Sequence, residues 1–219
     1  LWLTPLAAFA GASACGLGLL ALAHRHGRAD PLTILLMGIV FNTFAAAMVT
    51  FLKTIVEATK AQEILFWLMG IITVQPWETL GILGGACAIG LFIALSLANR
   101  LNLLTLGDAH AQTMGLNVAK TRIIAFLAAS LLVGSVVSVA GMVGFVGLIV
   151  PHIFRRLVGA DFRIVLPLCA LGGATFLIVA DILTRLAFLG FGTQIPVGVV
   201  TAFAGAPFFG VLLLRGKSP

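Results

Sequence analysis

Apolar segments of about twenty residues, separated by short polar connections, constrain this chain more than any other feature. A helix of that length crosses the ~30 Å hydrocarbon layer of a membrane at 1.5 Å per residue. We expect spans at roughly 3–22, 32–52, 79–98, 122–140, 142–157, 164–187 and 198–214. The sequence therefore predicts an all-α, polytopic transmembrane bundle with about seven spans.

The composition excludes a soluble domain. Hydrophobic residues make up 61% of the 219 residues and charged residues only 9%, whereas a soluble domain carries about a quarter charged residues. A chain of this length cannot bury so much apolar side chain from water, so the excess must face lipid. Cys15, Cys87 and Cys169 stand alone in apolar runs, which indicates neither a disulfide framework nor a metal site.

The fifth expected span, 142–157, is short and contains Pro151. Segments interrupted by glycine or proline are tolerated at membrane depth only where protein or a water-filled cavity satisfies the freed backbone groups. We therefore expect a broken or partial crossing here.

Basic residues sort to one side of the expected spans. The connections after the first, third and fifth spans, together with the C-terminus, hold Arg25, Arg28, Arg100, Lys120, Arg122, Arg155, Arg156, Arg163, Arg215 and Lys217. The positive-inside rule makes this side cytoplasmic, with the C-terminus inside and the N-terminus outside. The net charge of +6 is thereby explained as a topology signal and implies no nucleic-acid partner.

The longest cytoplasmic connection, 99–122, mixes leucine and methionine with polar residues. Gly107 and Gly115 bracket its central part, which begins with Asp108. This pattern predicts two short amphipathic helices under the membrane, with Asp108 near a helix N-terminus. Such a surface is suited to receive another protein; the alternative is a solvated linker.

Three polar residues inside or at the ends of spans are candidate functional groups. Asp181 is the only carboxylate deep inside an expected span, and it either forms an i,i+4 ion pair with Arg185, which we favour, or carries protons. His152 is either a proton carrier or ligand, or, as we favour, hydrogen-bonds a backbone group. Asp161 is expected to pair with one of the neighbouring arginines.

Motifs of enzymes are absent from the sequence. It contains no GxSxG, HExxH or Walker-type GxxxxGK motif and no pair of intramembrane carboxylates. We therefore expect a transport subunit rather than an enzyme, and a nucleotide-driven machine would need its ATPase on another chain. An intramembrane hydrolase that combines Ser130, Ser135 or Ser138 with His152 is the least favoured alternative.

Several ordered stretches resemble one known family. They are ILFWLMG at 64–70, NLLTLGDAHAQTMG at 102–115, AGMVGFVGLIVPHIFRR at 140–156, GADFRIVLPL at 159–168, ADILTR at 180–185 and IPVGVVTAFAGAPFF at 195–209. Together they resemble the FecCD-type permeases of iron-siderophore, haem and cobalamin ABC importers, with 64–70 matching that family's outward loop.

The resemblance implies a ten-helix subunit of a bacterial or archaeal cytoplasmic membrane. Such a subunit pairs with a second copy or a close homologue around a central path. Two ATPase subunits, which bind ATP and Mg²⁺, lie below it and a periplasmic or lipid-anchored substrate-binding protein lies above it; the permease itself binds no cofactor and no metal. Residues 1–219 are expected to form one transmembrane permease domain that matches the fourth to tenth helices, with 99–122 as its coupling segment and the first three helices missing.

Site residues follow from the resemblance by position. The expected ATPase-coupling residues are Gly107, Asp108, Ala109, Gln112, Met114 and Gly115. Arg185 is expected to dock the binding protein, and Asp30, Pro31 and Thr33 are expected to form a cytoplasmic gate. Pro31 departs from the small polar residue common in that gate, and Phe162 and Gln194 depart from the usual His and Glu.

The expected function is ATP-driven import of an iron chelate, a siderophore or haem complex, by alternating access; cobalamin is an alternative cargo. The competing hypothesis is a proton-coupled secondary transporter that uses Asp181 and His152 as a relay.

Overall fold

The computed structural model describes residues 31–192 and 195–215, preceded by Ala7, Ala10, Gly11, Ala14 and Gly18. Most of the first expected span, and also Asp30 and Gln194, lie outside the described residues. In the two continuous ranges the regular elements are helices: α2 (Pro31–Ile55), α3 (Ala58–Met69), α4 (Trp77–Ser96), α5 (Ala98–Leu104), α6 (Asp108–Thr113), α7 (Val118–Ala140), α8 (Val146–Val158), α9 (Phe162–Phe191) and α10 (Val197–Arg215). The all-α prediction is confirmed.

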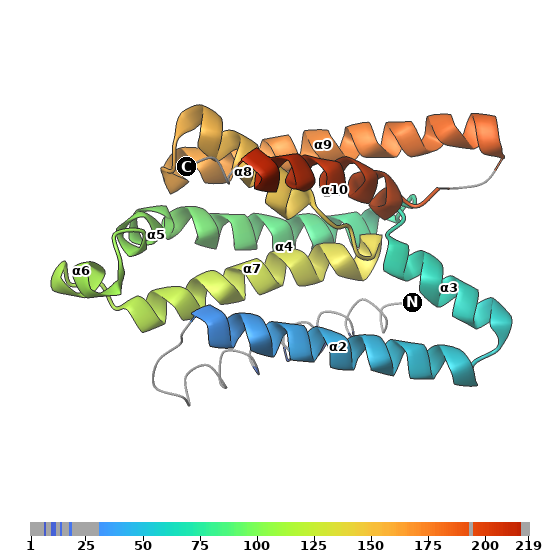
Figure 1. Ribbon diagram of the computed structural model, residues 1–219, viewed down its shortest axis with the longest axis horizontal. Coiled ribbons are helices and arrows are strands. Elements are labelled where there is room, and N and C mark those ends of the chain that lie inside the picture. The colour runs from blue at the N-terminus through green and yellow to red at the C-terminus, as the bar shows by residue number, and fades with distance from the viewer. Residues whose placement is uncertain are drawn as a thin grey trace.

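The long helices run side by side, and their ends gather at two ends of the molecule (Figure 1). One end, called here the α6 end, holds α5, α6 and the start of α7. The opposite end, called the α3 end, holds α3 and the C-terminal end of α9. The connections 99–117 and 159–161, both expected on the cytoplasmic side, thus lie at the α6 end.

Among the residues that the structure describes, four helices are long and apolar enough to cross a membrane. Their spanning segments are Gly38–Ile55, Trp77–Ser96, Val118–Ala140 and Phe162–Gly190, and α10 contributes a shorter apolar stretch, Val197–Leu212. The chain is therefore an integral, multi-pass membrane protein.

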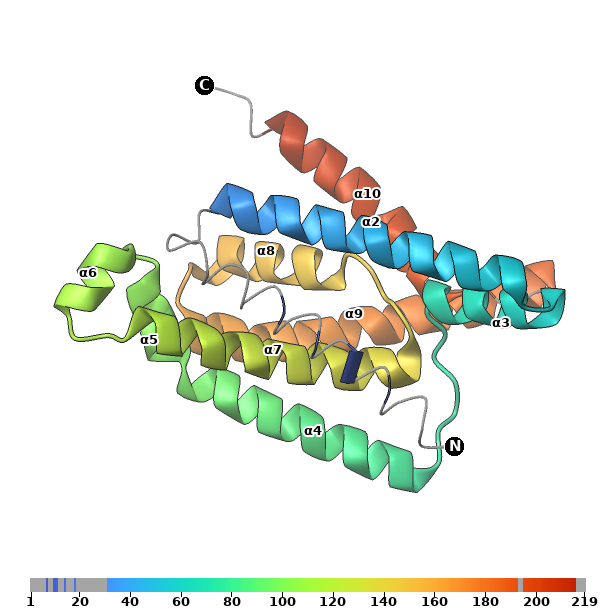
Figure 2. The same ribbon diagram turned by 90° about the horizontal axis from the view of Figure 1, so that it is seen from below.

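Helix α8 is the partial crossing expected from the sequence. Its 13 residues reach about 20 Å at 1.5 Å per residue, less than a membrane core. After α7 the chain turns back into the bundle before α8 starts (Figure 2). Phe145, the residue before α8, has a left-handed backbone (φ 65°), and its ring fills the space that a side chain on Gly205 of α10 would occupy. Its ring also lies 6.4 Å from that of Phe209 between centroids.

Three glycines bring α3, α7 and α10 into backbone contact near the α3 end, and we call them the glycine junction: Gly70, Gly141 and Gly198. A Cβ on Gly141 would overlap the carbonyl oxygen of Trp67, and one on Gly198 would overlap that of Met69. Gly70 and Gly141 also have left-handed backbones, with φ of 74° and 71°. Only glycine combines this conformation with so close an approach.

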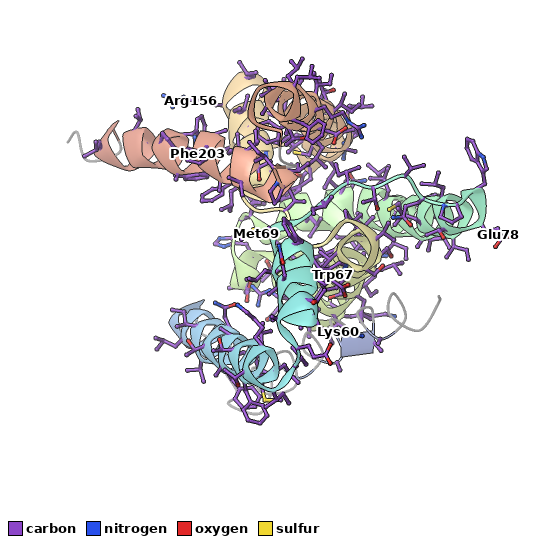
Figure 3. The ribbon with its side chains drawn as sticks, turned by 90° about the vertical axis from the view of Figure 1, so that its right-hand side faces the viewer. Lys60, Trp67, Met69, Glu78, Arg156 and Phe203 are labelled. Carbon is purple, nitrogen blue, oxygen red and sulfur yellow. The ribbon has the colours of Figure 1, made fainter. Side chains whose placement is uncertain are left out.

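Two hydrogen bonds tie the same three segments together. The N–H of Ile71 donates to the carbonyl of Ala140 at 3.0 Å, and the N–H of Val197 donates to the carbonyl of Gly70 at 3.0 Å. Figure 3 looks onto this end and shows α3, with Trp67 and Met69 labelled, lying between α2 and the group of α8, α9 and α10. Helix α3 is therefore the link between α2 and the rest of the bundle.

Helix α3 differs from the expectation of an outward loop at 64–70. The chain is helical from Ala58 to Met69 and leaves the helix at Gly70. Alanine, lysine, glutamate and leucine, which favour helices, fill this segment, and the left-handed glycine ends it.

Helices α4 and α7 pack along each other, and α4 also contacts α9. The approach is close at Gly90, where a Cβ would lie 2.7 Å from the Leu132 side chain. This pair forms the frame from which α5 and α6 extend.

We predict that Gly141→Ala destabilises the fold. In the variant an alanine must adopt a left-handed backbone, and its Cβ must also overlap the Trp67 carbonyl. Together these two effects should lower the free energy of unfolding by about 2–5 kcal/mol. The midpoint of thermal unfolding, followed by tryptophan fluorescence in detergent, should fall by roughly 5–15 °C. Gly81→Ala is the matched control, because nothing lies within 4 Å of its added Cβ. Equal midpoints for both variants would refute the role of the junction.

Candidate functional site

Two short helices lie at the α6 end, as the sequence predicts. Helix α5 continues almost directly from α4, and α6 begins at Asp108, which confirms its expected place at a helix N-terminus. Gly107 (φ 97°) and Gly115 (φ 79°) turn the chain into and out of α6. Both have conformations that side chains rarely adopt, so the two glycines fix the direction of α6.

Helix α6 has one inward contact and a broad exposed face. Ala111 is completely buried, and its carbonyl accepts a hydrogen bond from the N–H of Leu116 at 3.0 Å. Leu106 and Met114 are 58% and 62% exposed, although both are apolar. All six expected coupling residues are exposed: Gly107, Asp108, Ala109, Gln112, Met114 and Gly115. All six residues are thus accessible to a partner at the α6 end.

An ion pair connects α6 to α7. The Asp108 Oδ1 atom lies 2.8 Å from Arg122 Nη2, and both side chains are about half exposed, at 47% and 49%. A pair so open to water contributes only about 0–1 kcal/mol to stability. Its effect is to orient α6, while Asn117 caps α7 by accepting a hydrogen bond from the N–H of Lys120 at 3.0 Å.

A second polar cluster joins α5 to the start of α9, and we call it the α5–α9 clamp: Asn99, Asn102, Asp161, Phe162 and Arg163. Asn102 Nδ2 donates to Asp161 Oδ1 at 2.6 Å, and the N–H of Phe162 donates to Asn102 Oδ1 at 2.9 Å. Arg163 donates through Nε to Asn99 and through its N–H to Asp161 Oδ1, the latter at 2.9 Å. The side-chain amide of Asn102 is therefore used as donor and acceptor at once.

The expected ion pair of Asp161 with an arginine is wrong. Within the part of the chain that the structure describes, no arginine side-chain nitrogen forms an ion pair with this carboxylate. Asp161 instead caps α9; hydrogen bonds from the N–H of Arg163, and then from Asn102, lower the pKa of the carboxyl. Arg155 lies over the Phe162 ring, 5.1 Å from its centroid, as a cation–π contact.

Asn99 and Asn102 were not predicted from the sequence to be functional residues. Their partners lie about sixty residues further along the chain, so no local spacing reveals them. The only available signal was Asp161 before an apolar run, which is typical of a helix N-cap.

A recess of about 470 Å³ opens at the α3 end, and we call it the α3-end recess. Asp181 Oδ2 and Arg185 Nε lie 2.7 Å apart in it, which confirms the favoured i,i+4 ion pair. Asp181 is 21% exposed and Arg185 is 65% exposed, so the guanidinium faces outward. The lining comes from the segment after α3 and from α9 and α10: Ile71, Ile72, Thr73, Val74, Asp181, Thr184, Arg185, Phe188, Ile195 and Val197.

His152 lies in a separate cavity of about 490 Å³ between α8 and α10. Its ring meets Phe208 edge-on at 6.1 Å between centroids. Among the described residues, the buried Nε2 atom has no hydrogen-bond partner, so the favoured backbone hydrogen bond is not found for that atom. Asp181 and His152 line different cavities, and the structure does not bring them together.

The gate residues are described only in part. Pro31 and Thr33 lie in the first turn of α2, where proline is favoured because its missing N–H needs no partner. In residues 31–192 and 195–215, no three His, Cys, Asp or Glu side chains gather to hold a metal.

Comparison with known proteins places these features in a family. The sequence profile of the FecCD transport family matches residues 1–215. The cobalamin import system permease protein BtuC of Halobacterium salinarum is 37% identical over 96% of this chain and 56% of that protein. The Fe(3+)-citrate import system permease protein YfmD of Bacillus subtilis is 36% identical over 96% and 62%. The hemin transport system permease protein HmuU of Yersinia pestis is 37% identical over 88% and 57%.

The fold has a counterpart among solved structures. A metal-chelate type ABC transporter in an inward-facing conformation matches with a TM-score of 0.81 and 33% identity, over 97% of this chain and 73% of that one. The chain spans between 56% and 62% of the length of the three relatives above. Their names describe permeases, which are transport subunits and not enzymes.

We predict that the capping of α9 by Asp161 weakens at low pH. Because the folded-state pKa is lowered, the ionised carboxylate stabilises the fold above its ordinary pKa of about 3.9, and this contribution is lost as the pH falls through the lower folded value. Asp161→Asn should therefore lower the thermal midpoint at neutral pH, and the gap to the parent chain should close below about pH 4. A gap that persists at low pH would contradict this assignment.

Proposed function

Because the chain belongs to the FecCD transport family, we propose that it is the membrane-spanning part of a permease subunit of an ATP-driven importer. The observation that carries this proposal is the exposed face of α6, where six residues of the expected coupling segment lie together. Exposed Leu106 and Met114 on a short helix outside the bundle are suited to a protein partner. The partner we propose is an ATPase subunit, which would bind ATP and Mg²⁺.

The cargo we propose is an iron chelate, a siderophore or haem complex, with cobalamin as the alternative. Relatives named for cobalamin, ferric citrate and hemin are similarly distant, at 36–37% identity, so identity does not separate these cargoes. All three are bulky chelates of a metal ion. A path lined by apolar helices with few charges is compatible with each of them.

Two further partners complete the proposed assembly. Helix α2 presents large apolar side chains such as Phe44 (62% exposed) and Phe51 (60% exposed), and we assign part of this surface to a second permease copy. Arg185 at the α3-end recess is the proposed contact for an acidic side chain of the binding protein. In this arrangement the α6 end and the C-terminus face the cytoplasm of a bacterial or archaeal cell.

The proposed mechanism is alternating access. The ATPase subunits approach each other when they bind ATP, and they displace α6. The displacement then opens one end of the path and closes the other, with Pro31 and Thr33 at the cytoplasmic end. Residues of this chain bind partners and move; none of them forms or breaks a covalent bond.

A proton-coupled transporter is the alternative function. It would require a relay between Asp181 and His152, but these residues line separate cavities. Asp181 is also engaged by Arg185 at 2.7 Å. These observations favour the ATP-driven importer.

We predict that Asp108→Ala combined with Gln112→Ala uncouples the transporter. In the complete transporter, reconstituted with its ATPase and binding protein, uptake of radiolabelled chelate should fall at least about tenfold while the complex remains assembled, because the docking surface is altered. Arg122→Ala is the matched control, since it removes the same ion pair but leaves the side chains of α6 in place. Full uptake by the double variant would count against the coupling role.

We predict that Arg185→Ala weakens binding-protein docking. Loss of one charge-assisted contact should raise the dissociation constant of the binding protein about tenfold, measured by surface plasmon resonance on the transporter in nanodiscs. Asp181→Asn, which frees the guanidinium from its internal partner, should leave docking intact or tighten it. Loss of uptake in Asp181→Asn, with normal docking and ATP hydrolysis, would instead favour proton coupling.

A further inference from the structure

Helix α9 reaches from the α6 end to the α3-end recess as one continuous element. Its 30 residues give a length of about 45 Å at 1.5 Å per residue. Asp161 caps its first turn, and Arg185 lies in the recess near its other end. When the helix moves as a rigid body, a displacement of its first turn therefore also displaces Arg185 at the recess.

The α5–α9 clamp is the polar contact through which α5 holds that first turn. Asn99 and Asn102 lie three residues apart, hence on the same face of α5. Asn102 accepts from the backbone N–H of Phe162 and donates to the Asp161 carboxylate. Because both bonds use one planar amide, the rotation of its plane is fixed, and the two helices are held in one register.

The two short helices are attached to different long helices. Helix α6 is tied to α7 by the ion pair of Asp108 with Arg122, whereas α5 is tied to α9 by the clamp. Gly107, with its left-handed backbone, lies between them. The contacts thus connect α6 to α9 through α5 and Asn102, and connect α6 to α7 directly.

Helix α8 is locked to α9 beyond the clamp. A Cβ on Gly172 would overlap the ring of Phe154, and Arg155 lies over the ring of Phe162 at 5.1 Å. Side-chain packing therefore joins the first half of α9 to α8.

We propose that Asn102 is a positioning residue that passes the displacement of α6 to α9, and that α9 carries it to the α3-end recess. This inference rests on the proposed function, because it assumes an ATP-dependent displacement of α6. In this proposal the Asn102 amide links the cytoplasmic partner to the recess that holds Arg185.

The test measures two distances in the complete transporter, which includes its ATPase subunits. Spin labels are placed on cysteines introduced into a background in which Cys15, Cys87 and Cys169 are replaced by alanine. One pair, His110 with Leu95, reports α6 against α4. The other pair, Leu189 with Ile82, reports the far end of α9 against α4; these four side chains are exposed. Both distances are recorded by pulsed electron resonance with and without ATP and vanadate.

Three chains are compared. Asn102→Asp places a carboxylate against that of Asp161 and should break the clamp. Arg100→Ala changes an exposed residue of α5 that lies outside the clamp, and it is the matched control. The expected result is a shift of both label pairs in the parent chain, loss of only the α9 shift in Asn102→Asp, and retention of both shifts in Arg100→Ala.

Each other outcome is also decisive. An unchanged α9 shift in Asn102→Asp overturns the inference and leaves the proposed function standing. Loss of the α9 shift in Arg100→Ala as well also overturns the inference, because the loss would then not depend on the clamp. Absence of an α6 shift in the parent chain refutes the proposed function and the inference with it. If Asn102→Asp does not assemble, Asn102→Ala and Asn99→Ala are measured by the same criteria.

Discussion

The close contact of backbone with backbone at the glycine junction is the constraint on which the arrangement of helices depends. Gly70, Gly141 and Gly198 end or begin three helices at one place. Without side chains there, carbonyl oxygens and N–H groups of different segments approach closely enough to hydrogen-bond. In a membrane such bonds matter because no water is present to satisfy the backbone groups of non-helical turns.

The junction also determines where the partial helix α8 begins. The chain leaves α7 at Gly141 and turns back into the bundle, and Phe145 then enters a left-handed conformation that costs about 1–3 kcal/mol in strain. Its ring packs where Gly205 leaves space on α10. Part of this irregular backbone is thus covered by the chain itself, since Gly141 is buried and Phe145 is half-buried.

At the α6 end, contacts between polar side chains, rather than close packing at glycines, position the helices. Exposed ion pairs such as Asp108 with Arg122 add little stability, but they limit the directions in which α6 can point. The clamp at Asn102 acts in the same way on α5 and α9. A rigid bundle with weakly bonded short helices at one end is the arrangement expected of a surface that binds a moving partner and transmits its motion.

The sequence by itself determined the membrane class, the positions of the long helices, the partial crossing at α8, the two short helices of 99–122 and the Asp181–Arg185 pair. These follow from local information: runs of apolar residues, glycine and proline positions, and i,i+4 spacing. The tertiary structure alone decided the glycine junction, the partner of Asp161 and the separation of Asp181 from His152. Contacts between residues some sixty positions apart depend on how helices pack. Hydrophobic periodicity does not show which helices pack against each other.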